Sequence, residues 1–397
     1  MHNRKTNLLR HFHAVGYRYR LSSRRNLLLI ISSLIYCIPL AAQAPNSPAR
    51  NFAVLSAKAD AARDANQLND AVDLYKRALR LRPNWTEGWW SLGTIRYDQD
   101  DFAEAAQAFR KVVALDAKHG TARVMLGLCE FELGLDDSAL KHIEAGERIG
   151  IAKDPQLRDV VLYHEGVLLQ RKAKFEAAQE TLGQLCLTGN QEARVTETLG
   201  LVALRLSGNA TPGEGSPDLE VIQQAGHAAC LMAQKKYDEA RQEYDALTKE
   251  HPQYPYIHYA YGKLLVEINE TAAAVEEFKE EIKNQPEDIV SRLQIAAATY
   301  KTASATGLPY AEQAVKLDPQ SPFAHYLYGL LLLDTDDYRR AILELEIAKR
   351  AFPRDAKVYF ALGSAYSRAG REQDAARARA AFARLSKEAG TESNPEK

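Results

Sequence analysis

Histidine and cysteine are the residue types that most readily carry chemistry, and the sequence holds ten His and four Cys. The Cys residues, at positions 37, 129, 186 and 230, form no C-x-x-C pair, the spacing typical of zinc and iron–sulfur sites. The H-E-x-x-H, G-x-S-x-G, P-loop and dinucleotide-binding patterns are also absent from the sequence. We therefore predict that the chain is not an enzyme and has no catalytic residue, no metal site and no cofactor.

We expect the His and Cys residues of the repeats to have structural roles. His258 and His325 fall at equivalent places in the repeats described below, where another copy holds a Trp, so we expect them to pack against the core. Cys129, Cys186 and Cys230 lie in apolar stretches and are expected to be small buried residues. A disulfide is an open alternative in an oxidising compartment, but the sequence does not indicate which Cys residues would meet.

A period of 34 residues defines the elements that must position any site. With Thr86 as position 1, Trp89 and Gly93 fall at positions 4 and 8, and Ala105 and Phe109 at 20 and 24. The same frame recurs with starts at 52, 120, 159, 221, 255, 322 and 356. Positions 4, 8 and 11 form one stripe of a helix, and 20, 24 and 27 form another. Small residues at 8 and 20 let two antiparallel helices approach closely.

This pattern resembles the tetratricopeptide repeat (TPR) family, and the resemblance covers about residues 53–388. It implies an all-α fold, a TPR superhelical solenoid of about nine to ten helix pairs. Proline at position 32 is expected to stop the second helix of a pair, because it has no backbone N–H and disfavours helix at the preceding residue. The copy near 289 lacks the usual small residue at position 20, so we expect its second helix to be short and to begin near Pro309.

One stretch interrupts the repeats. Residues 207–217, Ser-Gly-Asn-Ala-Thr-Pro-Gly-Glu-Gly-Ser-Pro, have the composition of a linker. We therefore predict an N-terminal block over 45–206, a C-terminal block over 218–390, and a disordered tail over 391–397.

The first 44 residues have the parts of a bacterial secretory signal. Seven Lys and Arg and no acidic residue precede an apolar run over 27–42, which ends at the small-x-small site Ala42-Gln43-Ala44. This pattern predicts a signal peptide over 1–44 and a periplasmic or secreted protein. The alternative is a retained inner-membrane anchor facing the periplasm, although a span needs about 20 apolar residues and Pro39 interrupts the run.

The charge balance of the remaining chain excludes one class of partner. Removing the seven basic residues of 1–44 from the total of 51 Lys and Arg leaves 44 against 52 Asp and Glu, a net charge of −8. Such a mildly acidic body is not suited to phosphate backbones or anionic lipid. We expect no nucleic-acid partner, and contact with a membrane only through the N-terminal segment if it is not cleaved.

In TPR proteins, positions 2, 5, 9, 12 and 13 of the first helix line a concave groove. The resemblance therefore implies a partner-binding surface that is rich in aromatic residues, which supply contact area at low entropic cost. Four Tyr residues of the second block, at 256, 259, 300 and 326, are expected to form its main contact surface. The chain lacks the Lys/Asn set with which chaperone-binding members hold a C-terminal carboxylate. The alternative is that many of these rings pack on adjacent repeats. The predicted contact residues are Trp90, Tyr163, Tyr256, Tyr259, Lys263, Tyr300, Phe323, Tyr326 and Phe360.

Together these features predict a non-catalytic protein–protein interaction scaffold of the bacterial cell envelope, which binds a peptide or protein in the TPR groove. The alternative is a structural or assembly component that oligomerises or tethers an envelope complex through its outer faces. The sequence leaves the partner's identity, the pathway and the oligomeric state open.

Overall fold

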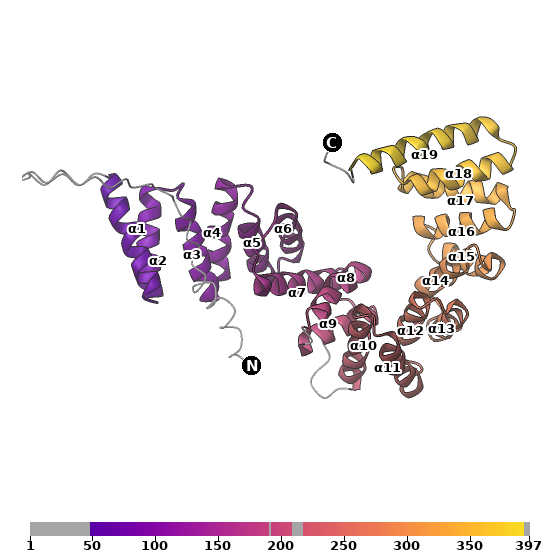
Figure 1. Ribbon diagram of the computed structural model, residues 1–397, viewed down its shortest axis with the longest axis horizontal. Helices are drawn as coiled ribbons and strands as arrows, with labels where there is room; N and C mark the ends of the chain where they lie inside the picture. The colour runs from indigo at the N-terminus through magenta and orange to yellow at the C-terminus, as the bar shows by residue number, and fades with distance from the viewer. Residues whose placement is uncertain (1–47, 190–191, 209–216, 393–397) are drawn as a thin grey trace, which may run out of the picture. The chain divides into compact units, whose positions relative to one another are not determined.

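The computed structural model describes residues 48–189, 192–208 and 217–392, and the regular structure in these ranges is entirely helical (Figure 1). This confirms the predicted all-α fold. The chain divides into two compact units between Leu169 and Gln170, and each is described by itself. The predicted signal peptide over 1–44 lies outside the described residues. None of the described helices combines the length and the apolar character that crossing a membrane requires.

The first unit contains α1 (Pro48–Asp64), α2 (Leu68–Leu81), α3 (Thr86–Asp98), α4 (Phe102–Leu115), α5 (Gly120–Glu132), α6 (Asp136–Ile149) and most of α7 (Pro155–Arg171). The second contains α8 (Phe175–Leu187), α9 (Ala193–Ala203), α10 (Pro217–Ala233), α11 (Tyr237–Glu250), α12 (Ile257–Glu267), α13 (Thr271–Asn284), α14 (Ile289–Thr299), α15 (Ser304–Leu317), α16 (Pro322–Asp334), α17 (Tyr338–Ala351), α18 (Ala356–Arg368) and α19 (Glu372–Glu392).

Glycine at position 8 marks the crossing of the two helices of a pair, as the repeat frame predicted. At three such crossings a Cβ added to the glycine would lie 2.5–2.8 Å from the side chain at position 24 of the partner helix, closer than van der Waals contact allows. The equivalence of these crossings confirms that the repeats are copies of one packing unit. The three contacts are Gly93 with Phe109, Gly262 with Phe278, and Gly329 with Leu345.

The side chain at position 4 fills a second recurring role. It donates a hydrogen bond to the backbone carbonyl six residues earlier, which belongs to the proline or adjoining turn after the preceding second helix. Helix ends leave carbonyl groups without intrahelical partners, so this bond ties each pair to the one before it. The bonds are Trp89 Nε1 to Pro83 O (2.8 Å), Arg123 to Ala117 O (3.4 Å), His258 Nε2 to Pro252 O (3.0 Å), Arg292 to Pro286 O (2.7 Å), His325 Nε2 to Pro319 O (3.1 Å) and the Tyr359 hydroxyl to Pro353 O (3.0 Å).

The helices on the two sides of the predicted linker pack directly on each other. A Cβ on Gly200 of α9 would lie 1.8 Å from the backbone oxygen of Ile222, and one on Gly226 of α10 would lie 1.7 Å from that of Thr196. The two backbones are therefore in contact, within one compact unit. Residues 209–216 of the linker lie outside the described residues, so the division into blocks at 207–217 stays a prediction.

The expectation of a short helix beginning near Pro309 is wrong. Helix α15 begins at Ser304, spans 14 residues and contains Pro309 in its interior. The small residue missing at the expected position is displaced by one: a Cβ on Gly307 would lie 2.1 Å from Thr299 Oγ1 of α14. A single-residue shift between the two helices preserves the close crossing, and fixed-period counting from the start of the repeat misses it.

Residues 391 and 392, at the start of the predicted disordered tail, belong to the last turn of α19. The rest of that tail, 393–397, lies outside the described residues.

Candidate partner-binding surface

Two helices of the second unit begin with the same local pattern, an aromatic residue, any residue, His and a second aromatic residue. In α12 and the residue before it this is Tyr256-Ile-His258-Tyr259, and in α16 it is Phe323-Ala-His325-Tyr326. The rings of Tyr256 and Tyr259 lie edge to face with centroids 6.0 Å apart, and those of Phe323 and Tyr326 are 6.5 Å apart. We call these the α12 pair and the α16 pair.

The predicted contact residues differ in how far solvent reaches them. Phe323 is 48% exposed, and Phe360 of α18 is 60% exposed while one side of its ring packs on Phe382 of α19. Tyr256 and Tyr326 are half-buried, whereas Tyr259 is only 2% exposed. Phe323 and Phe360 are therefore exposed to a partner without rearrangement, whereas Tyr259 lies beneath the surface.

A buried carboxylate from the neighbouring helix fixes the backbone of the α12 pair. Glu281 of α13 is fully buried; its Oε1 accepts the N–H of Tyr256 at 2.8 Å and its Oε2 accepts that of Tyr259 at 3.2 Å. Tyr256 has a left-handed backbone (φ 64°), which turns the chain into the helix. Burial raises the pKa of Glu281, and the two N–H donors oppose that rise. Glu281 thus accepts hydrogen bonds from backbone N–H groups at the start of α12, a role that a capping residue usually has.

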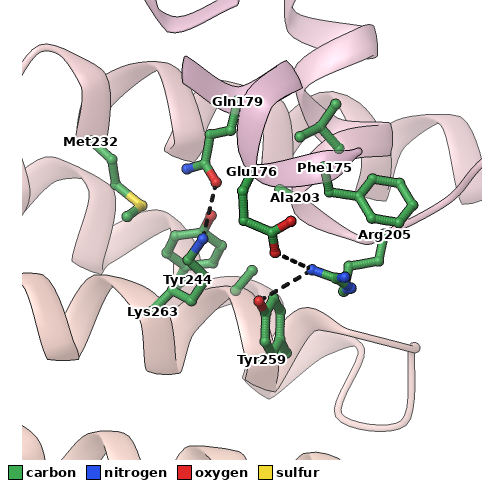
Figure 2. A pocket seen from close by; sticks show the side chains of 11 residues that line it. Phe175, Glu176, Gln179, Ala203, Arg205, Met232, Tyr244, Tyr259 and Lys263 are labelled. Carbon is green, nitrogen blue, oxygen red and sulfur yellow. Dashed lines mark hydrogen bonds and ion pairs between the residues drawn. The ribbon is translucent and has the colours of Figure 1, made fainter. Parts of the chain in front are cut away.

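A cluster of charged and aromatic side chains surrounds Tyr259 (Figure 2). The Arg205 guanidinium lies 4.7 Å from the ring of Phe175 and 5.3 Å from that of Tyr259. It pairs with Glu176 at 2.7 Å and donates a hydrogen bond to the Tyr259 hydroxyl at 3.2 Å. Nearby, Lys263 Nζ donates to Gln179 Oε1 at 3.3 Å. These residues come from α8, the end of α9 and α12, and only the fold brings them together.

The electrostatics of this cluster favour its internal pairing. Burial works to raise the pKa of Glu176, but the hydrogen bond and charge of Arg205 outweigh it and hold that pKa below its usual value. Burial lowers the pKa of Lys263, with the charge of Glu176 working in the opposite direction. The recess between these side chains has about 10 Å³ of free volume, roughly enough for one water molecule. It can accept a single small polar group and cannot enclose a larger ligand.

Sequence reasoning identified Tyr259 and Lys263 of this cluster and missed Arg205 and Glu176. Arg205 follows the last turn of α9 and has a left-handed backbone (φ 52°). It lies just before the predicted linker, beyond the groove positions that the family pattern assigns to a first helix. Glu176 lies on a second helix of a pair, which the groove rule also leaves out. No periodic signal pointed to either residue.

The other predicted contact residues pack against their neighbours. In the first unit, Trp90 stacks on His119 with centroids 5.1 Å apart, and Tyr163 lies edge-on to His164 at 5.4 Å. In the second, Tyr300 is half-buried beneath Lys301 Nζ, 4.9 Å from the ring centroid. Two of the nine residues belong to the first unit and seven to the second, so the nine do not form one continuous site within a single unit.

Cys186 of α8 and Cys230 of α10 form a disulfide, with their Cα atoms 5.5 Å apart. Both helices line the cluster around Tyr259, and the Gln234 side chain donates to the Cys186 carbonyl at 2.9 Å beside the bridge. The interpretation of these two Cys residues as small apolar core residues is therefore corrected. Cys129 is buried and free, as that interpretation expected.

A wider hollow of about 750 Å³ lies elsewhere in the second unit, between the start of α17 and the turn before α19. Its lining includes Tyr338, Arg371 and Leu343, and Leu343 is 64% exposed. This hollow lies beside α17, the second helix of a pair, and does not include the groove positions of the first helices. Within the described ranges, no group of three or more His, Cys, Asp or Glu side chains is arranged to hold a metal ion.

Comparisons with solved structures find several chains that are similar over part of this chain or most of it. MamA from Desulfovibrio magneticus RS-1 shares 20% identity, covering 42% of this chain and 94% of its own, with a TM-score of 0.39. YrrB, described as a TPR protein with an unusual peptide-binding site, shares 17% identity over 41% of this chain and 85% of its own, with a TM-score of 0.38. Yeast Tom70 shares 14% identity over 85% of this chain and 69% of its own, with a TM-score of 0.33. A search of curated proteins finds no match.

A family model described as a tetratricopeptide repeat matches residues 56–118, 91–154, 230–289 and 329–390, more than half of the chain. These matches cover the repeats in which position 8 glycines face their partner helices. The chain belongs to the tetratricopeptide repeat family.

Proposed function

We propose that this protein is a non-catalytic scaffold that binds a peptide or protein partner along the first helices of its repeats, with Phe323 and Phe360 as exposed anchors. The observation that carries the proposal is exposure. Among the aromatic side chains of the described residues, these two are the exposed ones, and both lie at groove positions of first helices, α16 and α18. Exposed aromatic residues on first helices of this kind are typical of binding hot spots.

Export to the bacterial cell envelope is part of the proposal. Its support is the pattern of the first 44 residues together with the Cys186–Cys230 disulfide. Disulfides persist in oxidising compartments such as the periplasm and are rare in the cytosol. A periplasmic or secreted protein, or one anchored in the inner membrane and facing the periplasm, has the environment that this bridge needs.

A test of the binding surface compares two matched pairs of exposed apolar side chains. The first pair of substitutions is Phe323→Ala with Phe360→Ala, and the control pair is Leu343→Ala with Ile347→Ala on α17, where the side chains are 64% and 39% exposed. Each protein is used to capture partners from a native envelope extract, which are then identified by mass spectrometry. Truncating a hot-spot aromatic costs about 2 kcal/mol or more, so we expect the Phe variant to lose a partner that wild type and control retain.

Equal capture by all three proteins, with unchanged helical circular dichroism, would contradict the assignment of Phe323 and Phe360. Loss in the α17 control alone would instead favour the alternative function, an assembly component that uses its outer faces. The hollow of about 750 Å³ beside Leu343 supports that alternative. Light scattering of the purified protein separates the two functions, since a strict monomer at high concentration disfavours self-assembly.

A further inference from the structure

The hydrogen-bond slot at position 4 is filled in two chemically different ways. In four repeats it holds Trp89, Arg123, Arg292 or Tyr359, residue types whose N–H or O–H donors do not titrate near neutral pH. In two repeats of the second unit it holds His258 or His325. Histidine is the one occupant of this slot whose ordinary pKa lies near neutrality.

Both nitrogens of each histidine face oxygen atoms that can only accept. His258 Nδ1 lies 2.7 Å from Glu277 Oε2, and its Nε2 lies 3.0 Å from the Pro252 carbonyl. His325 repeats the arrangement, with Nδ1 2.5 Å from Glu344 Oε2 and Nε2 3.1 Å from the Pro319 carbonyl. A neutral imidazole has one N–H, whereas the imidazolium cation has two. Because the two residues are only 8% and 6% exposed, water does not readily replace a missing donor.

We propose that His258 is a proton-dependent latch, which as an imidazolium cation holds the α12 pair in place and on deprotonation loosens the surface offered to a partner. The proposal rests on the proposed function for its biological consequence, but the latch itself can be measured without a partner. His258 lies inside the pair that it controls, between Tyr256 and Tyr259, and His325 lies at the matching place between Phe323 and Tyr326.

The charges around His258 connect its proton to the backbone of the α12 pair. Glu277 and Glu281, both on α13, favour the imidazolium, and Asn284 of the same helix donates to the Pro252 carbonyl at 2.7 Å. In return, the charge of His258 lowers the pKa of Glu281, against the opposing effects of burial and of Asp288. Losing the His258 proton therefore removes a cation beside the carboxylate that holds the two tyrosine N–H groups. At His325 the contacting charge is Glu344 of α17.

The direction of the pH effect follows from the balance at His258. Burial lowers its pKa, but the hydrogen bond and charge of Glu277 with the Pro252 carbonyl outweigh this, so the folded pKa lies above the ordinary 6.5. The folded state then binds the proton more tightly than the unfolded state. The stabilisation is fully present below about pH 6.5 and is lost as the pH rises through the folded pKa.

The first measurement reads the protons directly in the full chain. Nitrogen-15 NMR of the histidine side chains at pH 6 should show both ring nitrogens of His258 protonated. Finding His258 as a neutral tautomer at that pH would overturn the latch. This measurement uses the unaltered protein and does not depend on any variant folding.

The second measurement follows the loosening through hydrogen–deuterium exchange of α12, corrected for the intrinsic effect of pH. Because the folded pKa of His258 lies above its ordinary value, we expect protection of α12 to fall between pH 6 and pH 8.5. The variant His258→Gln keeps a side-chain N–H donor without a titrating group, so its protection should change less over this range than that of the wild type.

The control for this experiment is His227→Gln. His227 contacts Glu243 at 3.1 Å, but its side chain is 46% exposed and it does not lie within an aromatic pair. This variant should keep the pH response of the wild type. A wild-type protein whose α12 protection does not depend on pH would overturn the latch.

Partner capture at pH 6 and pH 8.5 then separates the latch from the proposed function. Weaker capture at pH 8.5 by wild type, with no such change in the His258→Gln variant, supports control of the surface. Capture that is equal at both pH values despite pH-dependent exchange would overturn that control. Absence of capture at both values, with the exchange response intact, would count against the proposed function while supporting the latch.

Discussion

The two compact units use the same helix-pair packing but place their ionisable groups differently. In the second unit, His258 and His325 bind a carboxylate and a backbone carbonyl at once. In the first unit, Trp89 occupies the equivalent slot and has no titrating group. A pair of carboxyls outside the slot, Glu147 and Glu165, has raised pKa values there. Burial raises the pKa of Glu165 to about 8, with the nearby Glu147 adding to the rise.

This difference shows that repeated geometry does not imply repeated chemistry. Glu165 and His258 both bind a proton more tightly in the folded state, so both contributions to stability are lost as pH rises. Glu165 loses its contribution from its ordinary pKa of 4.5 up to about 8, and His258 does so above about 6.5. The units also differ at their surfaces, since Trp90 stacks on His119 whereas Phe323 and Phe360 remain exposed.

The largest effect is expected where two helix backbones touch in the second unit. In Gly200→Ala the new Cβ would lie 1.8 Å from the Ile222 carbonyl oxygen, with backbone rather than a flexible side chain in the way. We expect a loss of about 3 kcal/mol or more in the free energy of unfolding, measured by denaturant titration. Gly363→Ala is the control, because its nearest neighbour would be 3.3 Å away on the Arg379 side chain. Equal stability of the two variants would refute the close α9–α10 crossing.

Removing the disulfide should have the next largest effect and should be confined to the second unit. Cys186 and Cys230 are separated by 44 residues in sequence, and closing a loop of this size stabilises a fold by about 3 kcal/mol. The double variant Cys186→Ser with Cys230→Ser should therefore increase hydrogen exchange in α8 and α10 while leaving α3 to α5 unchanged. Treating wild type with a reductant should have the same effect. Unchanged exchange after confirmed reduction would show that the bridge adds little to this fold.

The carboxyl pair offers a stabilising change in the first unit. Glu165→Gln replaces the group with an uncharged one of similar shape, so the cost of ionising it when buried disappears. We expect a gain of about 1–2 kcal/mol at pH 8 and little change at pH 4, read from thermal melts across that range. Glu192→Gln, whose carboxylate is exposed beside Arg194, is the control and should gain nothing at pH 8. A Glu165→Gln protein that is less stable at pH 8 would mean that the carboxylate is ionised and favourably paired.

The smallest effect concerns the slot at position 4 when its occupant does not titrate. Tyr359→Phe removes the hydroxyl that donates to the Pro353 carbonyl at 3.0 Å and keeps the ring. The expected loss is about 0.5–1 kcal/mol, independent of pH between 5 and 8 in denaturant titrations. A pH-dependent loss would contradict the contrast between Tyr359 and His258.

Particular residues show how far the sequence could be used for prediction. Gly93, Gly262 and Gly329 were placed at equivalent helix crossings by spacing alone, and the structure confirms all three. Gly307 was missed because its repeat is shifted by one residue, which a fixed frame does not register. The histidines were predicted as packing residues; they are buried, but the carboxylates and carbonyls that bind both nitrogens come from other elements.

The sequence by itself determined the helices, their pairing and the family, because these depend on local spacing of apolar, small and helix-stopping residues along one chain. Only the tertiary structure decided that Cys186 meets Cys230, that Arg205 lies between Phe175 and Tyr259, and that Phe323 and Phe360 stay exposed while Tyr259 does not. Each of these outcomes depends on side chains from different helices. Their distances depend on how successive pairs stack, which the 34-residue period constrains without fixing.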